Sequence, residues 1–152
     1  MNSNEYVKLT QLFSEKNYES RWFVAEVNYY AAAGRVLDLL KNHLKLGYGI
    51  DKDSILRELG NLLKTFVELC VCTMSHNDFI SHEWSKSREM VPAGVSGCAN
   101  GILNMIRATS NDRRIHFLAN ACSHLGFSFI DVAQSSVDNL KDQYPDMDLE
   151  II

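Results

Sequence analysis

Polar side chains three residues apart stand in two apolar stretches of this 152-residue chain, Arg35 and Asp38 in the first and Glu58 and Asn61 in the second. Residues with this spacing share one face of a helix. Carboxylates placed in this way can hold a magnesium ion, and a guanidinium can bind a phosphate or a carboxylate. The mixture of side chains favours binding of a charged group over a complete metal site.

Other charged residues do not complete such a site. Glu68 lies further along the helix of Glu58, and Glu26 precedes Arg35 by nine residues, so it points roughly the opposite way. Lys41, Lys45 and Lys64 could join Arg35 in attracting a phosphate. Bases in such positions are also typical of the solvated side of a helix, and both interpretations stay open.

Three further signals have structural interpretations. The glycines at 94, 97 and 101 lack the Lys-Ser/Thr ending of a phosphate loop and favour close helix packing. The aromatic residues near the first long helix could stack on a base or serve the core or a subunit contact; they are Trp22, Phe23, Tyr29 and Tyr30. The cysteines lack C-x-x-C spacing, and we interpret them as reduced core thiols of a cytoplasmic protein; they are Cys70, Cys72, Cys98 and Cys122.

Two long helices should position these side chains. Apolar residues at three- and four-residue steps predict a helix from Trp22 to Leu46, ended by Gly47 and Gly49. Its predicted inward residues are Val24, Val27, Ala31, Val36, Leu37, Leu39, Leu40 and Leu44. The next helix runs from about Ser54 to Met74 with Asp51 or Asp53 as its cap, and its inward residues are Leu56, Leu59, Leu62, Leu63, Phe66, Val67 and Cys70.

The second half of the chain predicts shorter helices. Residues 75–91 are polar and indicate a loop, and a helix with small residues follows from about Ala93. Asn111 or Asp112 should cap another helix that ends near His124.

A last helix closes the chain. Gly126 ends the preceding helix, and Ser128 followed by Asp131 resembles a capping box. This helix should run to Leu140 and stop at Tyr144 and Pro145.

The composition predicts one all-helical domain over residues 1–152. The chain is 46% hydrophobic and 22% charged, and its N-terminal segment 1–19 is polar. A net charge of -4 argues against a nucleic acid polymer as partner, and the absence of a long apolar run argues against a membrane. Residues 33–41 echo residues 99–107, which suggests two repeated helical hairpins, 22–75 and 93–126, or the general likeness of amphipathic helices.

Several segments together carry a resemblance to a known family. They are Ala32-Ala-Gly-Arg-Val-Leu-Asp38, Gly47-Tyr-Gly-Ile-Asp51, Arg57-Glu-Leu-Gly-Asn61, Leu125-Gly-Phe-Ser-Phe-Ile-Asp-Val132 and Asn139-Leu-Lys-Asp-Gln-Tyr-Pro-Asp146. Their order and spacing resemble the MazG-type nucleoside triphosphate pyrophosphatases, which include compact phage-encoded relatives. The resemblance implies an all-α helical bundle, magnesium as cofactor and a homo-oligomer.

The resemblance also shows what this chain lacks. The family carries E-x-x-E on one helix and E-x-x-D on the next, and these positions fall on Ala32, Arg35, Glu58 and Asn61. Only Glu58 keeps its carboxylate, with Asp38 as a possible second metal ligand. The family's nucleotide-contacting Asn and Lys align with Ser136 and Asn139, and Lys141 remains in that helix. We therefore expect Arg35 to pair with Glu58 and to place a fixed positive charge where the family holds magnesium.

Three functions follow from these residues. The first is a degenerate protein that binds a nucleotide or a protein partner without hydrolysis and needs no cofactor, with Arg35, Asp38, Glu58, Asn61 and Lys141 as ligand-binding residues. The second is a magnesium-dependent pyrophosphohydrolase of reduced activity. The third is a structural helical adaptor.

Overall fold

The computed structural model describes residues 2–17, 22–46, 49, 51–73 and 94–145. These residues form helices and the turns between them, and they contain no strand, as the sequence predicts. The helices are α1 (Ser3–Asn17), α2 (Trp22–Leu46), α3 (Lys52–Cys72), α5 (Gly94–Arg107), α6 (Asn111–His124) and α7 (Phe129–Gln143). The predicted loop at 75–91 lies outside the described residues.

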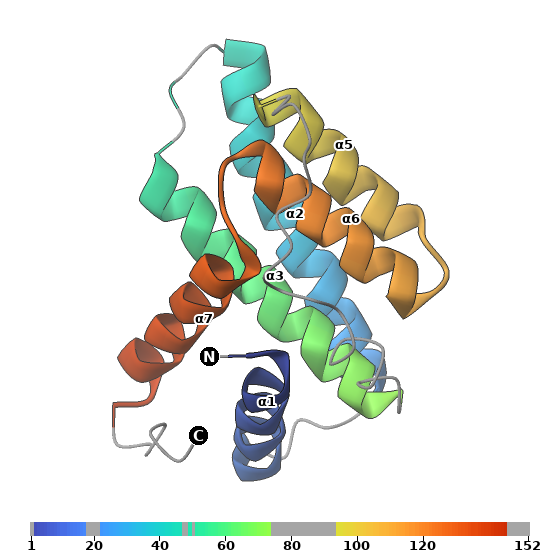
Figure 1. Ribbon diagram of the computed structural model, residues 1–152, viewed down its shortest axis with the longest axis vertical. Helices are drawn as coiled ribbons and strands as arrows, with labels where there is room; N and C mark the ends of the chain where they lie inside the picture. The colour runs from blue at the N-terminus through green and yellow to red at the C-terminus, as the bar shows by residue number, and fades with distance from the viewer. Residues whose placement is uncertain (1, 18–21, 47–48, 50, 74–93, 146–152) are drawn as a thin grey trace.

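Two helical hairpins form the centre of the fold. α2 packs along α3, α5 packs along α6, and α2 also contacts α5 (Figure 1). α7, near the C-terminus, packs on α3, and α1, near the N-terminus, also packs on α3. α2 with α3 and α5 with α6 thus form two helical hairpins, while a repeat that relates them stays a prediction.

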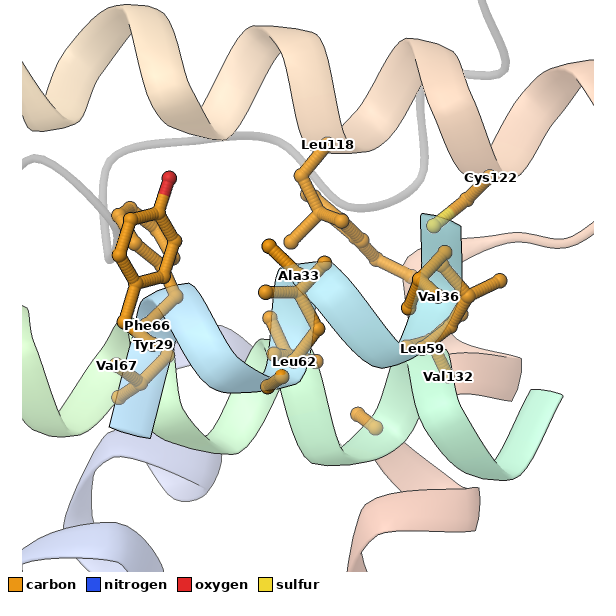
Figure 2. Packing of buried hydrophobic residues seen from close by; sticks show 14 of the residues in the cluster. Tyr29, Ala33, Val36, Leu59, Leu62, Phe66, Val67, Leu118, Cys122 and Val132 are labelled. Atoms are coloured by element: carbon orange, nitrogen blue, oxygen red, sulfur yellow. The ribbon is translucent and has the colours of Figure 1, made fainter. Parts of the chain in front are cut away.

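One apolar cluster joins all six of these helices. Ala33 of α2 lies between Leu62 of α3 and Leu118 of α6, as Figure 2 shows. Gly101 lets α5 approach α6, because a Cβ there would come within 2.9 Å of Ala121 Cβ. Close packing at this glycine was predicted from the sequence.

The buried face of α2 differs from the predicted one. Val27 and Leu44 are exposed, and Ala31 also faces outward, so these three predictions were wrong. The core positions are Ala25, Tyr29, Ala32, Ala33, Val36 and Leu40. Apolar residues of α2 occupy several of its faces, so a period of three and four residues is consistent with more than one buried face.

The helix ends follow local chemistry. Asp51 caps α3 by accepting a bond from Asp53 N, and Ser128 and Asp131 form the predicted capping box of α7. The cap of α6 is Ser110, whose hydroxyl accepts from Arg113 N, so the prediction of Asn111 or Asp112 was wrong by one residue or two. Gly126 has a φ of 82°, which a residue with a side chain rarely adopts.

α1 was not predicted. Most of its residues 3–10 are polar, yet Tyr6, Val7, Leu9 and Thr10 are buried against the rest of the fold. Because this short segment contains few apolar residues, the sequence gives no clear helical period that would predict its buried face.

Candidate functional site

The α2–α3 hairpin brings two of the predicted site residues together, Arg35 of α2 and Glu58 of α3. Arg35 Nε donates a hydrogen bond to Glu58 Oε2 at 3.3 Å, so the expected pairing of these side chains is present. The Arg35 side chain is 52% exposed and that of Glu58 is 23% exposed. Solvent screens an ion pair this open, and we expect it to contribute about 0 to 1 kcal/mol to stability.

Ala32 does not belong to this surface. It has no exposed area and lies in the core, although it is only three residues from Arg35. A carboxylate at this position would enter the core of the hairpin. The local fold therefore leaves no room for an acidic pair on α2 at the positions that the family resemblance indicates.

Asn61 serves the packing of α7 on α3. Its Oδ1 accepts a hydrogen bond from Asn139 Nδ2 at 3.2 Å, and the same amide nitrogen donates to the Arg57 carbonyl at 3.3 Å. Gly60 lies beside this contact, because a Cβ there would come within 2.9 Å of Ser136 N. These side chains connect two helices, and Asn139 is almost fully buried.

Ser136 forms a hydrogen bond with Tyr6, a residue that was not among the predicted site residues. The Tyr6 hydroxyl lies 2.6 Å from Ser136 Oγ, and both side chains are buried. Burial raises the pKa of Tyr6 above its ordinary value, and the hydrogen bond with Ser136 partly offsets that rise. Tyr6 and Ser136 are 130 residues apart, and no local signal in the sequence indicates their contact.

The remaining candidate carboxylates have lysine neighbours. Asp38 is 75% exposed and lies 3.4 Å from Lys41, and Glu68 lies 3.9 Å from Lys64. Lys141 is exposed on α7. Among the described residues, no three histidine, cysteine or acidic side chains come together in a group that could hold a metal ion.

A groove of about 650 Å³ lies between the start of α3 and α7. Leu56 and Phe127 give it apolar walls. Its charged residues are one arginine and four aspartates: Arg57, Asp53, Asp131, Asp138 and Asp142. This groove was not predicted, although Asp131, Asp138 and Asp142 recur at helical spacing in the sequence.

A second groove, of about 470 Å³, follows the last turns of α2 beside Ala99 of α5. Leu37, Leu40 and Leu44 line it. Lys41 and Lys45 stand with Asp38 among its lining residues. This groove combines an apolar surface with two positive charges.

The aromatic residues of α2 have different surroundings. The Tyr29 hydroxyl donates to the Met105 carbonyl at 3.2 Å, and the Arg114 guanidinium lies 5.4 Å from the centre of the Tyr29 ring. Tyr29 is thus a core residue. Trp22, Phe23 and Tyr30 are exposed.

No protein-family model, curated protein or solved structure matches this chain. The resemblance described above therefore stays an expectation based on its motifs. None of the helices in the described ranges has the length and apolarity needed to cross a membrane.

Proposed function

We propose that this chain has a MazG-like scaffold and acts by binding a ligand without hydrolysing it. The observation that carries this proposal is the ion pair of Arg35 with Glu58. In a magnesium-dependent pyrophosphatase, clustered carboxylates hold the metal that activates water. Here the one carboxylate left at the four aligned positions faces a guanidinium, which supplies positive charge but cannot lower the pKa of a bound water as a metal does.

The surroundings of the pair support a role without metal. Asp38 and Glu68 lie beside lysines, and Ala32 is part of the core. Loss of a single metal-site group commonly lowers activity by about 10-fold or more, and three aligned carboxylates are absent here. Turnover at ordinary enzymatic speed would require ligands that the described residues do not bring together.

A nucleotide is the first candidate ligand. The two terminal nitrogens of Arg35 have no hydrogen-bond partner among the described residues and can bind phosphate oxygens. Further along α2, Lys41 and Lys45 border the second groove, whose apolar lining suits a base or a sugar edge. This ligand would bind without magnesium.

A protein partner is the second candidate, and the acidic groove between α3 and α7 favours it. Four aspartates and one arginine would repel a triphosphate but attract a basic segment. Leu56 and Phe127 offer apolar contact to such a segment.

Calorimetry with ATP, dATP and dUTP, with and without magnesium, tests the first candidate when combined with a pyrophosphate-release assay. We expect binding that magnesium does not strengthen and no release above background. Arg35→Ala should weaken the binding about 10-fold, while Arg113→Ala, an exposed arginine on α6, should leave it unchanged. Metal-dependent turnover at enzymatic rates would show that the enzyme alternative is correct.

The protein-partner candidate has its own test. A short lysine-rich peptide should bind more weakly to the double variant Asp138→Asn, Asp142→Asn than to the parent protein, with the difference fading at high salt. Asp112→Asn on α6 is the matched control. If the protein binds neither nucleotides nor the peptide, the structural adaptor becomes the favoured function.

A further inference from the structure

The acidic groove between the start of α3 and α7 carries negative charge that its own side chains do not neutralise. Asp131, Asp138 and Asp142 of α7 and Asp53 of α3 line it, and Arg57 is the one base among its described lining residues. None of the four carboxylates forms an ion pair within the described part of the chain, not even with Arg57. The groove therefore holds four negative charges against one positive charge.

Carboxylates on the long helices outside the groove have different surroundings. Each of three such side chains lies within 3.9 Å of a base; the pairs are Glu58 with Arg35, Asp38 with Lys41, and Glu68 with Lys64. Like charges that are gathered without a counter-charge repel one another, so a cation that enters the groove is stabilised there. The unpaired carboxylates indicate a positively charged occupant.

The walls of the groove favour long basic side chains as this occupant. Leu56 and Phe127 are partly buried and line the groove beside the aspartates. A lysine or arginine has an apolar stem and a charged end, so its stem can cover such a wall while its end reaches a carboxylate. In the described ranges, no three acidic side chains come close enough together to hold a metal ion.

The spacing of the α7 aspartates indicates the form of the partner. Asp138 follows Asp131 by seven residues, and Asp142 follows Asp138 by four. Both steps keep side chains on one side of a helix, so the carboxylates form a row about 16 Å long. A second helix laid alongside presents side chains at the same two steps. In an extended segment the longer step corresponds to about three residues, and side chains three residues apart point to opposite faces.

We propose that the acidic groove binds an amphipathic basic helix of a partner protein, which runs antiparallel to α7. Its bases stand at steps of four and then seven, and they face Asp142, Asp138 and Asp131 in that order. The antiparallel direction places the partial positive charge of the partner's first turn near the C-terminal end of α7. This inference deepens the protein-partner candidate and rests on that part of the proposed function.

Arg57 makes the groove selective. It lies on the α3 side of the groove, and its guanidinium forms no ion pair with the described residues. A base placed next to Arg57 would be repelled, whereas a carboxylate of the partner can pair with it. The partner helix should therefore direct bases toward α7 and an acidic or neutral side chain toward α3.

Two helical peptides of identical composition test the proposal by calorimetry with the full chain. The matched peptide carries three lysines at steps of four and seven, together with two leucines, on a background of alanine and glutamine. The staggered peptide contains the same residues, but its lysines stand at steps of five and five, which distributes them around the helix. We expect the matched peptide to bind at least about 5-fold more tightly, with the difference fading at high salt.

Charge exchange tests the register. Asp138→Lys should abolish the preference for the matched peptide, and glutamate in place of the second lysine of that peptide should restore binding to this variant. Arg57→Ala should strengthen binding of the matched peptide about 2-fold, because a repelling charge is removed. Asp112→Asn on α6 is the matched control and should leave the affinity unchanged. Circular dichroism would show that each variant keeps its helices.

The outcomes separate this inference from the rest of the proposed function. Equal affinity for the two peptides would overturn the basic helix as partner, although a general attraction of basic segments would then remain. Absence of binding by either peptide would also overturn it, while nucleotide binding measured on the same sample would leave the first candidate function intact. A preference for the matched peptide that survives Asp138→Lys would likewise contradict the proposed register.

Discussion

At the scale of single residues, neighbouring positions on α2 have opposite surroundings. Arg35 is half exposed and bonded to Glu58, whereas Ala32 is enclosed by the core. The alignment of motifs could predict the Arg35–Glu58 contact, because both residues lie on one hairpin and carry opposite charges. It could not reveal the burial of Ala32, since that depends on which face of α2 meets α3 and α6.

This difference predicts the outcome of restoring an acidic residue to α2. Ala32→Glu should lower the free energy of unfolding by at least about 3 kcal/mol, because it buries a carboxylate that has no partner in the core. Ala31→Glu, on the exposed side of the same helix, should change it by less than about 0.5 kcal/mol. Urea titrations of both variants give these values. Equal effects at the two positions would contradict the burial described here.

The bond between Tyr6 and Ser136 gives a second prediction at this scale. Tyr6→Phe keeps the ring but removes the hydroxyl that lies 2.6 Å from Ser136 Oγ, and should cost about 1 to 2 kcal/mol because it leaves a buried polar group unsatisfied. Tyr30→Phe, on an exposed tyrosine, should be nearly neutral. Ser136→Ala in the Tyr6→Phe background should cost less than it does alone, as a double-mutant cycle would measure.

At the scale of helices, the sequence predicts a helix end correctly where neighbouring residues alone determine it. Glycines after Leu46 mark the end of α2, and the Ser128–Asp131 box marks the start of α7. α1 was missed because its buried residues are held by Ser136 and other partners far along the chain. The link of Asn61 to Asn139 was hidden for the same reason. Contacts between distant helices define most of the candidate site, and the sequence of one helix does not report them.

Two glycines in adjacent helices should respond oppositely to the same substitution. Gly60→Ala should destabilise the protein by about 1 to 3 kcal/mol, because the new methyl group would come within 2.9 Å of Ser136 N in the α7 backbone. Gly34→Ala should stabilise the protein by about 0.4 to 1 kcal/mol, because alanine restricts the unfolded chain and meets no atom of the described fold. Thermal or urea unfolding compares the two variants. A stabilising Gly60→Ala would show that α7 packs less closely than described.

The start of α3 predicts a dependence on pH. Hydrogen bonds from the Ser54 hydroxyl and the Asp53 amide hold the pKa of Asp51 below its ordinary value. Since the folded pKa is the lower one, the stabilisation is complete above the unfolded pKa, near 4, and is lost as the pH falls through the folded pKa. Asp51→Asn should therefore reduce the loss of stability between neutral and strongly acidic pH. Ser54→Ala should reduce it by a smaller amount, because one of the bonds remains; an unchanged acid profile in both variants would contradict this account.

At the scale of the whole molecule, the buried cysteines report whether the two hairpins unfold together. Cys70 lies on α3 of the first hairpin, and Cys98 and Cys122 lie on α5 and α6 of the second. Burial raises the pKa of Cys98 to about 12 and raises that of Cys122 as well, so their native thiols should be unreactive.

Thiol labelling should therefore proceed through opening of the fold. Because one apolar cluster joins both hairpins, Cys70 and Cys122 should be labelled with the same opening free energy, close to that of global unfolding. Cys72 is only partly buried and should react first. Mass spectrometry of a time course, repeated at rising urea, resolves each cysteine. If Cys122 opened at a clearly lower free energy than Cys70, the second hairpin would be an independent folding unit, and the two hairpins would form two cooperative units instead of one.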